Sequence, residues 1–185
     1  MAALLIRVES HGGLAETDRR VAAAVILAAV VAAAAAYLLL LGGSIESDHG
    51  VNQGQIAVNF VVDGLDNSRF NLRSHRGESI VIEFMTTWCG TCRSQINELK
   101  RLHEAFNEVV IATIDIDANL GLFDLEDLAA EKAIPWFVGH SPQLGRTYGV
   151  YYIPTIIVVD GEGIIRYRGL YTPFNELQLI LQQIQ

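Results

Sequence analysis

The sequence predicts an α/β domain, a central mixed β-sheet flanked by helices, preceded by one N-terminal transmembrane helix. Two observations support this fold class. After residue 54, short β-branched runs alternate with segments whose apolar residues have helical spacing, which is the pattern of α/β domains. Before them, every residue from Val21 to Leu41 is apolar. A chain of 185 residues has room for one globular domain plus this appendage.

The apolar run is long enough to cross a bilayer. Its 21 residues, at about 1.5 Å of helical rise each, match a hydrocarbon thickness of about 30 Å. A cleaved secretory signal is the alternative, but its apolar core has only about 7 to 15 residues. Arg7, Arg19 and Arg20 precede the run, and no lysine or arginine occurs from 42 to 68. The positive-inside rule therefore places the N-terminus in the cytoplasm.

These observations predict a single-pass protein of the cell membrane with its folded domain on the extracytoplasmic side. The predicted parts are a cytoplasmic tail (1–20), a transmembrane anchor (21–41), a flexible linker (42–53) and the α/β domain (54–185). The net charge of −8 falls entirely after residue 41. Because such a surface repels phosphate groups, we expect no nucleic acid among the partners.

The first half of the domain is expected to contain two strands and a helix. Ile56 to Val62 is predicted as the first strand, and a short extended segment follows at 70–72. Ile80 to Met85 is uniformly apolar except for one residue and is predicted as a buried strand. A helix should follow, because Ile96, Leu99, Leu102 and Phe106 recur at helical spacing.

The second half of the domain is expected to complete the sheet with an antiparallel edge. The predicted elements are a strand at 109–116, a helix at 122–133, a short strand at 136–138, a strand at 156–159, its hairpin partner at 164–168 and a C-terminal helix. Thr172 and Pro173 are expected to cap and begin that helix.

The only two cysteines of the chain, Cys89 and Cys92, lie three residues apart in Trp-Cys-Gly-Thr-Cys, between a predicted strand and a predicted helix. A cysteine in the first turn of a helix meets the positive end of the helix dipole and free backbone donors, which favour the reactive thiolate. Cys92 is close enough in sequence to attack a mixed disulfide formed by Cys89. The spacing predicts a redox-active disulfide with Cys89 as nucleophile and Cys92 as resolving cysteine.

Two other uses of the cysteines fit the sequence less well. Zinc would need four ligands, but there is no second cysteine pair and the five histidines show no ligand spacing. A purely structural disulfide would close too short a loop to restrain the unfolded chain much. We therefore expect no metal and no cofactor.

Glu83 and Pro154 stand out beside the cysteine pair. Glu83 interrupts the otherwise apolar strand Ile80 to Met85, and a carboxyl group buried there could accept the proton of Cys92. The alternative is a solvated glutamate on an edge strand. Pro154 precedes the last long strand, where it would suit either a strand start or a cis turn.

Together these residues resemble the thioredoxin superfamily, specifically its membrane-anchored, extracytoplasmic TlpA-like branch, which includes cytochrome-maturation reductases. The resemblance covers about 54–185 and includes, besides the cysteine motif, Asn59-Phe60, Asp63-Gly64, Phe70-Asn71-Leu72, Arg76-Gly77, Tyr148-Gly149-Val150, Ile153-Pro154-Thr155 and Asp160-Gly161-Glu162-Gly163. It implies a thioredoxin-like fold with an additional βα unit between Cys92 and Pro154. It also implies that Pro154 is a cis-proline facing the disulfide, that Glu83 is the buried acid, and that Trp88, Ile153 and Thr155 contact the substrate.

The resemblance implies an enzyme that exchanges thiols and disulfides. We expect a reductase of cysteine-containing exported proteins, recharged by an electron donor in the membrane. The Gly-Thr dipeptide between the cysteines does not fix the direction of electron flow. An extracytoplasmic dithiol oxidant and a copper-handling thioredoxin-like module are the alternatives. The chain differs from many members of this branch in having Gln95 and Asn97 where an acid and a proline occur.

Overall fold

The computed structural model describes residues 12–41, 49–119 and 122–184. The chain divides into two units, one ending at Glu46 and one comprising Ser47–Gln185. The first unit contains the helix α1, Gly12–Leu41. Among the helices of the described ranges, none meets the combined requirement of length and hydropathy for crossing a membrane. The spanning helix predicted at 21–41 is therefore unconfirmed and stays a prediction.

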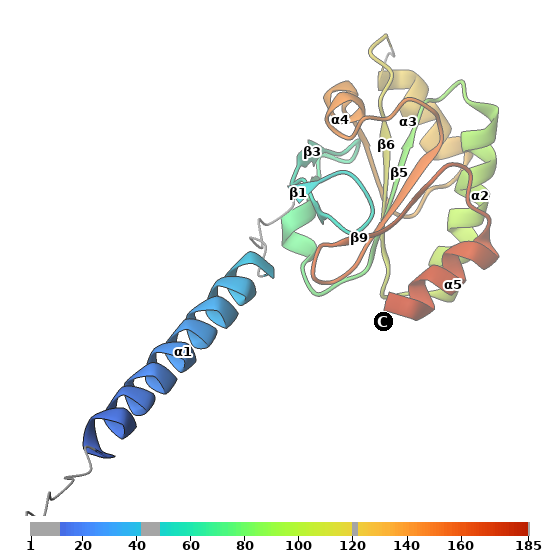
Figure 1. Cartoon of the computed structure of the whole chain (residues 1–185). Coiled ribbons are helices and arrows are strands. Elements are labelled where there is room, and N and C mark those ends of the chain that lie inside the picture. The colour runs from blue at the N-terminus through green and yellow to red at the C-terminus, as the bar shows by residue number, and fades with distance from the viewer. Residues whose placement is uncertain (1–11, 42–48, 120–121, 185) are drawn as a thin grey trace, which may run out of the picture. The chain divides into compact units, whose positions relative to one another are not determined.

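The second unit is built on a five-stranded mixed sheet with the order β7-β6-β5-β8-β9 (Figure 1). The strands are β5 (Ile80–Met85), β6 (Val110–Asp115), β7 (Phe137–His140), β8 (Thr155–Val159) and β9 (Ile165–Gly169). Strands β5, β6 and β7 run parallel, whereas β8 is antiparallel to both β5 and β9. All six side chains of β5 are buried, as expected for the central strand of a sheet covered on both faces.

Helices cover one face of the sheet (Figure 1). They are α2 (Gly90–Ala105) and α5 (Phe174–Ile184), and α3 (Leu122–Glu131) lies beyond them along the sheet. Their apolar residues pack on alternate residues of the strands, in a core that includes Val81, Ile111, Ile156, Leu99 and Leu177. This face also carries Glu83, because Val81 and Glu83 are two residues apart on the same strand.

The opposite face is covered by the N-terminal strands and by α4 (Pro142–Thr147) (Figure 1). The N-terminal elements are β1 (His49–Gly50), β2 (Ile56–Ala57), β3 (Val61–Asp63), β4 (Arg69–Asn71) and the 3₁₀ helix η1 (Leu72–His75). An aromatic group forms the centre of this core: Phe60 contacts both Phe70 and Tyr148, and Tyr148 contacts Phe84. The Tyr148 hydroxyl donates to the Val58 carbonyl at 2.5 Å and ties the two layers together.

The structure corrects three sequence predictions in this domain. The single strand predicted at 56–62 is two strands, because β2 pairs with β1 while β3 pairs with β4. Part of the linker predicted at 42–53 lies in the domain, since β1 falls at His49–Gly50 and pairs with β2; residues 42–48 lie outside the described ranges. The Thr172 side chain does not cap α5, because its hydroxyl donates to the Leu170 carbonyl at 2.8 Å.

Candidate functional site

Cys89 lies at the junction between β5 and α2, where it is the N-cap residue of α2. Its φ and ψ angles of −82° and 109° are extended. Helical backbone therefore begins only at the next residue, and the Cys89 side chain lies at the N-terminal end of the helix. The backbone N–H of Cys92 donates to the Cys89 sulfur at 3.1 Å. This donor and the positive end of the helix dipole both stabilise a thiolate at Cys89.

The two cysteines form a disulfide and differ sharply in exposure. Their Cα atoms are 5.2 Å apart. Cys89 is 8% exposed whereas Cys92 is 0% exposed. Cys92 packs in a cluster with Met85, Ile96 and Leu128, so a large partner reaches Cys89 first. This asymmetry fits the predicted order of attack, in which Cys89 meets the substrate and Cys92 acts afterwards.

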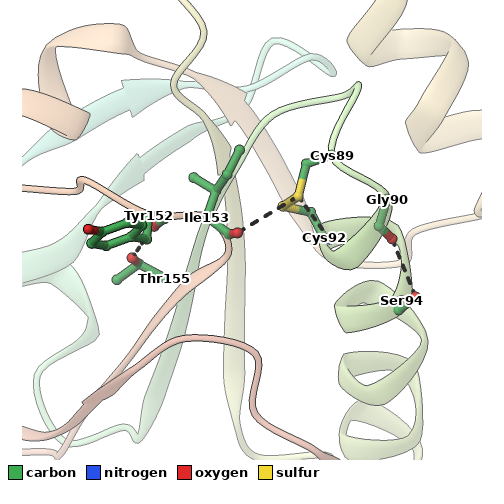
Figure 2. The surroundings of a disulfide bond; sticks show 7 residues. All are labelled: Cys89, Gly90, Cys92, Ser94, Tyr152, Ile153 and Thr155. Carbon is green, nitrogen blue, oxygen red and sulfur yellow. Dashed lines mark hydrogen bonds between the residues drawn. A yellow bond between two sulfur atoms is a disulfide. The ribbon is translucent and has the colours of Figure 1, made fainter.

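The loop before β8 faces the disulfide (Figure 2). The peptide bond between Ile153 and Pro154 is cis, as the resemblance implies. The Ile153 carbonyl oxygen lies 4.0 Å from the Cys89 sulfur. The Thr155 side chain is buried and its hydroxyl donates to the Tyr152 carbonyl at 2.7 Å. The Thr155 hydroxyl therefore holds the loop, and any substrate contact of Thr155 would come from its backbone.

Exposed aromatic side chains occur in this loop and directly before Cys89 in the sequence. Trp88 is 70% exposed, and Tyr151 and Tyr152 are 88% and 72% exposed. A cavity of 370 Å³ lies beside the loop, lined by Tyr151, Tyr152, Leu170 and other residues. Aromatic side chains that expose this much area supply contact surface for a partner protein.

The Trp88 side chain is held by a hydrogen bond to Asp117, which lies just after β6. Its indole N–H donates to Asp117 Oδ2 at 2.6 Å. The hydrogen bond from the Asn119 backbone N–H and the bond from Trp88 lower the pKa of Asp117. The Asp117 backbone N–H donates in turn to Asp115 Oδ1 at 2.9 Å. His140 Nδ1 lies 3.1 Å from the same oxygen. Burial raises the pKa of Asp115, whose side chain is fully enclosed.

Glu83 is fully buried on the helix-covered face of β5. Burial raises its pKa from 4.5 to about 8, although a hydrogen bond from Thr113 acts in the opposite direction. The Thr113 hydroxyl lies 3.0 Å from Glu83 Oε2, and the Trp136 indole N–H donates to Thr113 at 3.0 Å. The sequence alternative of a solvated edge glutamate is wrong, since β5 is the central strand. A carboxyl group with this pKa exchanges protons near neutral pH.

The sequence reasoning missed the residues whose hydrogen bonds support Glu83 and Trp88. They are Thr113, Asp115, Asp117, Trp136 and His140. A signal for three of them was present, because Thr113, Asp115 and Asp117 alternate with apolar residues in and just after a strand we expected to be buried. Gln95, noted as a departure from the family pattern, has a structural role: its side chain pairs with the backbone N–H and carbonyl of Thr172.

No metal centre emerges from the side chains that the structure describes. Groups of three or more histidine, cysteine, aspartate or glutamate residues placed to hold an ion are absent from these ranges.

Comparison with known sequences relates this site to thiol–disulfide exchange proteins. The thiol-disulfide oxidoreductase ResA of Bacillus thuringiensis subsp. konkukian is 26% identical over 117 residues, which are 60% of this chain and 65% of that protein. The thiol:disulfide interchange protein DsbE of Escherichia coli K12 is 33% identical over 93 residues, half of each chain. The chain thus matches half to two thirds of the length of these curated relatives.

Solved structures share the architecture. The thioredoxin domain of a thiol-disulfide oxidoreductase from Bacteroides vulgatus superimposes with a TM-score of 0.65 at 19% identity, covering 74% of this chain and all of that one. A thioredoxin family protein from Chlorobium tepidum gives 0.62 at 22% identity, covering 72% of this chain and 97% of that one. These superpositions confirm the predicted thioredoxin-like fold. The redoxin family model matches residues 52–176, and the chain therefore belongs to the redoxin family.

Proposed function

We propose that this protein is a thiol–disulfide oxidoreductase whose redox centre is the Cys89–Cys92 pair. The observation that carries the proposal is the placement of Cys89. Its sulfur lies at the N-terminus of α2, accepts a backbone hydrogen bond from Cys92 and faces the cis-proline loop, while Cys92 is enclosed. A stabilised, reachable thiolate beside a buried second thiol is the arrangement that disulfide exchange needs.

In the reducing direction the reaction has two steps. The Cys89 thiolate attacks one sulfur of a substrate disulfide, forming a mixed disulfide and releasing the other substrate sulfur as a thiolate. Cys92 then loses its proton and attacks the Cys89 sulfur, which breaks the mixed disulfide and releases the second substrate thiolate. The substrate gains two electrons, and the enzyme is left with the Cys89–Cys92 disulfide.

The residues near the cysteines have separate roles in this scheme. Glu83, with its raised pKa, accepts the proton of Cys92 before the second attack. The cis-proline loop at Pro154 offers the backbone of Ile153 and Thr155 to an extended substrate segment, and Trp88 supplies apolar contact next to Cys89. Electrons lost to the substrate must be restored by a donor of two electrons.

We propose further that the enzyme is anchored in the cell membrane and reduces disulfides of exported proteins, as a reductase of the cytochrome-maturation type would. The support is the apolar run at 21–41 and the position of the arginines before it. The large apolar side chains described in α1 are also exposed; they are Val21, Val25, Ile26, Leu27, Val30, Val31 and Tyr37. A donor in the membrane would then recharge the dithiol.

Trapping of mixed disulfides tests the redox proposal. In the Cys92→Ser variant the second step is blocked, so mixed disulfides with partner proteins should accumulate through Cys89. The matched Cys89→Ser variant should accumulate none. Diagonal non-reducing and reducing gels of both variants, expressed as full chains, provide the measurement. Equal trapping by the two variants would overturn the assignment of nucleophile and resolving cysteine.

The direction of electron flow has its own test. The runner-up is an oxidant that introduces disulfides, and the two roles differ in reduction potential. Equilibration of the protein with glutathione buffers measures that potential. A value close to about −120 mV, the range of strong oxidants, would reject the reductase role. A copper titration that blocks alkylation of Cys89 would instead support the copper-handling alternative.

A further inference from the structure

The buried carboxyl group of Glu83 is held by a chain of two hydrogen bonds from different elements. The Trp136 indole N–H donates to Thr113 Oγ1 at 3.0 Å, and Thr113 Oγ1 lies 3.0 Å from Glu83 Oε2. Thr113 is on β6, directly opposite Glu83 on β5. Trp136 lies just before β7, so three neighbouring segments of the sheet meet at this carboxyl group.

When Glu83 is ionised, the donors in this chain have only one consistent arrangement. An indole N–H can only donate, so Thr113 must accept from Trp136. A hydroxyl has one hydrogen of its own, and the remaining partner of Thr113 is Glu83 Oε2. Oε2 is therefore held by a donor, while Oε1 is buried and has no hydrogen-bond partner among the described residues. The two carboxyl oxygens are thus inequivalent.

We propose that Thr113 and Trp136 are positioning residues for Glu83, fixing Oε2 so that Oε1 is the oxygen that exchanges a proton during disulfide exchange. This inference rests on the proposed function and deepens it. Trp136 connects the carboxyl group to the cysteines, because its side chain also packs against the cluster that contains Cys89 and Cys92. Movement of Trp136 would therefore alter both the packing around Cys92 and the donor that reaches Glu83.

Several titratable groups share this face of the sheet. They include Asp115 on β6, His140 on β7, Tyr167 on β9, and Cys92, Glu98 and His103 on α2. The His103 ring contacts Trp136, at 5.8 Å between ring centroids. The causes that shift the pKa of Glu83 are burial and the Thr113 hydrogen bond. The bond to Thr113 is thus the main feature that a substitution can change without altering burial.

Three variants of the full chain in detergent micelles test the proposal. Thr113→Val replaces the hydroxyl by a methyl group of similar size, Thr113→Ser keeps the hydroxyl, and Trp136→Phe removes the upstream donor. The carboxyl carbon of Glu83 is titrated by NMR in the oxidised protein, with its signal assigned by its loss in Glu83→Gln. We expect an upward shift of the Glu83 pKa by about one unit in Thr113→Val, since a bond to a charged group is lost. A smaller upward shift should occur in Trp136→Phe, and Thr113→Ser should titrate like the wild type.

A rate measurement completes the test. The resolution of a mixed disulfide at pH 7 should be about tenfold slower in Thr113→Val, because the ionised fraction of Glu83 falls about tenfold, and Thr113→Ser should restore it. An unchanged Glu83 titration in Thr113→Val would overturn the positioning role. If the titration shifts but Glu83→Gln resolves mixed disulfides at the wild-type rate, the proton-acceptor role of Glu83 fails instead. A folding defect in Thr113→Val would appear in near-ultraviolet circular dichroism, and Thr113→Ser and Trp136→Phe would then decide the outcome.

Discussion

The fully buried carboxyl group of Glu83 should give the stability of the domain a characteristic pH dependence. The pKa of Glu83 is about 8 in the fold against 4.5 for the ordinary side chain. Between these values the folded state holds a proton that the unfolded state has lost, so the free energy of unfolding falls as the pH rises through this window. The full effect, present above pH 8, corresponds to about 5 kcal/mol.

Glu83→Gln should remove most of this slope and stabilise the oxidised protein at pH 9, while changing little at pH 4. Urea unfolding at pH 4, 6, 8 and 9 gives the comparison. Glu104→Gln, an exposed site on α2, is the control and should retain the wild-type slope. Asp115, whose pKa is also raised by burial, contributes a slope of the same sign, which Asp115→Asn isolates. A wild-type slope in Glu83→Gln would show that the carboxyl group is solvated.

The Trp88 side chain should depend on Asp117 for its position. Asp117→Ala removes the acceptor that lies 2.6 Å from the Trp88 indole nitrogen. Because the bond is exposed to solvent, we expect a loss of about 1 kcal/mol in the interaction, hence an up to fivefold slower first attack on a protein disulfide. Trp88 fluorescence, recorded in a Trp136→Phe background, should report a more mobile indole. Asp124→Ala, an exposed change on α3, should alter neither reading.

At the scale of elements, the junction between α2 and the segment before α5 depends on one side chain. Gln95 Nε2 donates to the Thr172 carbonyl at 2.9 Å, and the Thr172 N–H donates to Gln95 Oε1 at 2.7 Å. Both residues are fully buried. Gln95→Leu leaves two buried backbone groups without partners and should cost about 2 to 6 kcal/mol of stability, at about 1 to 3 kcal/mol for each group. Ser94→Ala on the same helix should cost under about 0.5 kcal/mol in the same urea experiment.

The regular elements were predictable where a periodic pattern ran through them. The strand expected at 80–85 matches β5 residue for residue, and the C-terminal hairpin forms the antiparallel edge as expected. The N-terminal strands were not distinguished by pattern, because the three residues that separate β2 from β3 are mostly apolar, with Asn59 between Val58 and Phe60. Their division is set by pairing with different neighbours, β1 for β2 and β4 for β3, and the composition of the run itself does not reveal those partners.

The candidate site was likewise predictable only in part. The cysteine pair, Glu83 and Pro154 were found because each breaks a local pattern or carries a motif. Trp136 and His140 were not, because they bond to Thr113 and Asp115 across 23 and 25 residues of chain. Parallel strands bring such residues together only once the order of the sheet is known. Hydrogen-bonded support of a site is therefore less visible in the sequence than its reactive atoms.

At the scale of the whole molecule, the proposed anchor determines where the cysteine pair can work. A redox centre outside the cytoplasm cannot be recharged directly by cytoplasmic thiols, so anchoring and electron supply are linked. The first unit and the folded second unit should be separable, because the second unit, Ser47–Gln185, forms a compact unit through contacts among its own residues. Removal of the first unit should release the protein from the membrane without changing the intrinsic redox potential.

Membrane fractionation and thiol labelling together test this arrangement. The full chain should remain in the membrane pellet after alkaline carbonate extraction, whereas the double substitution Val30→Arg and Val31→Arg should release it, because each central arginine costs about 2.5 to 3.5 kcal/mol on insertion. In intact cells treated with a reductant, a membrane-impermeant maleimide should label Cys89 of the anchored protein. Labelling only after lysis would place the domain in the cytoplasm and contradict the proposed orientation. Release of the full chain by carbonate would reject the anchor itself while leaving the thiol chemistry of Cys89 to be judged by the trapping experiment alone.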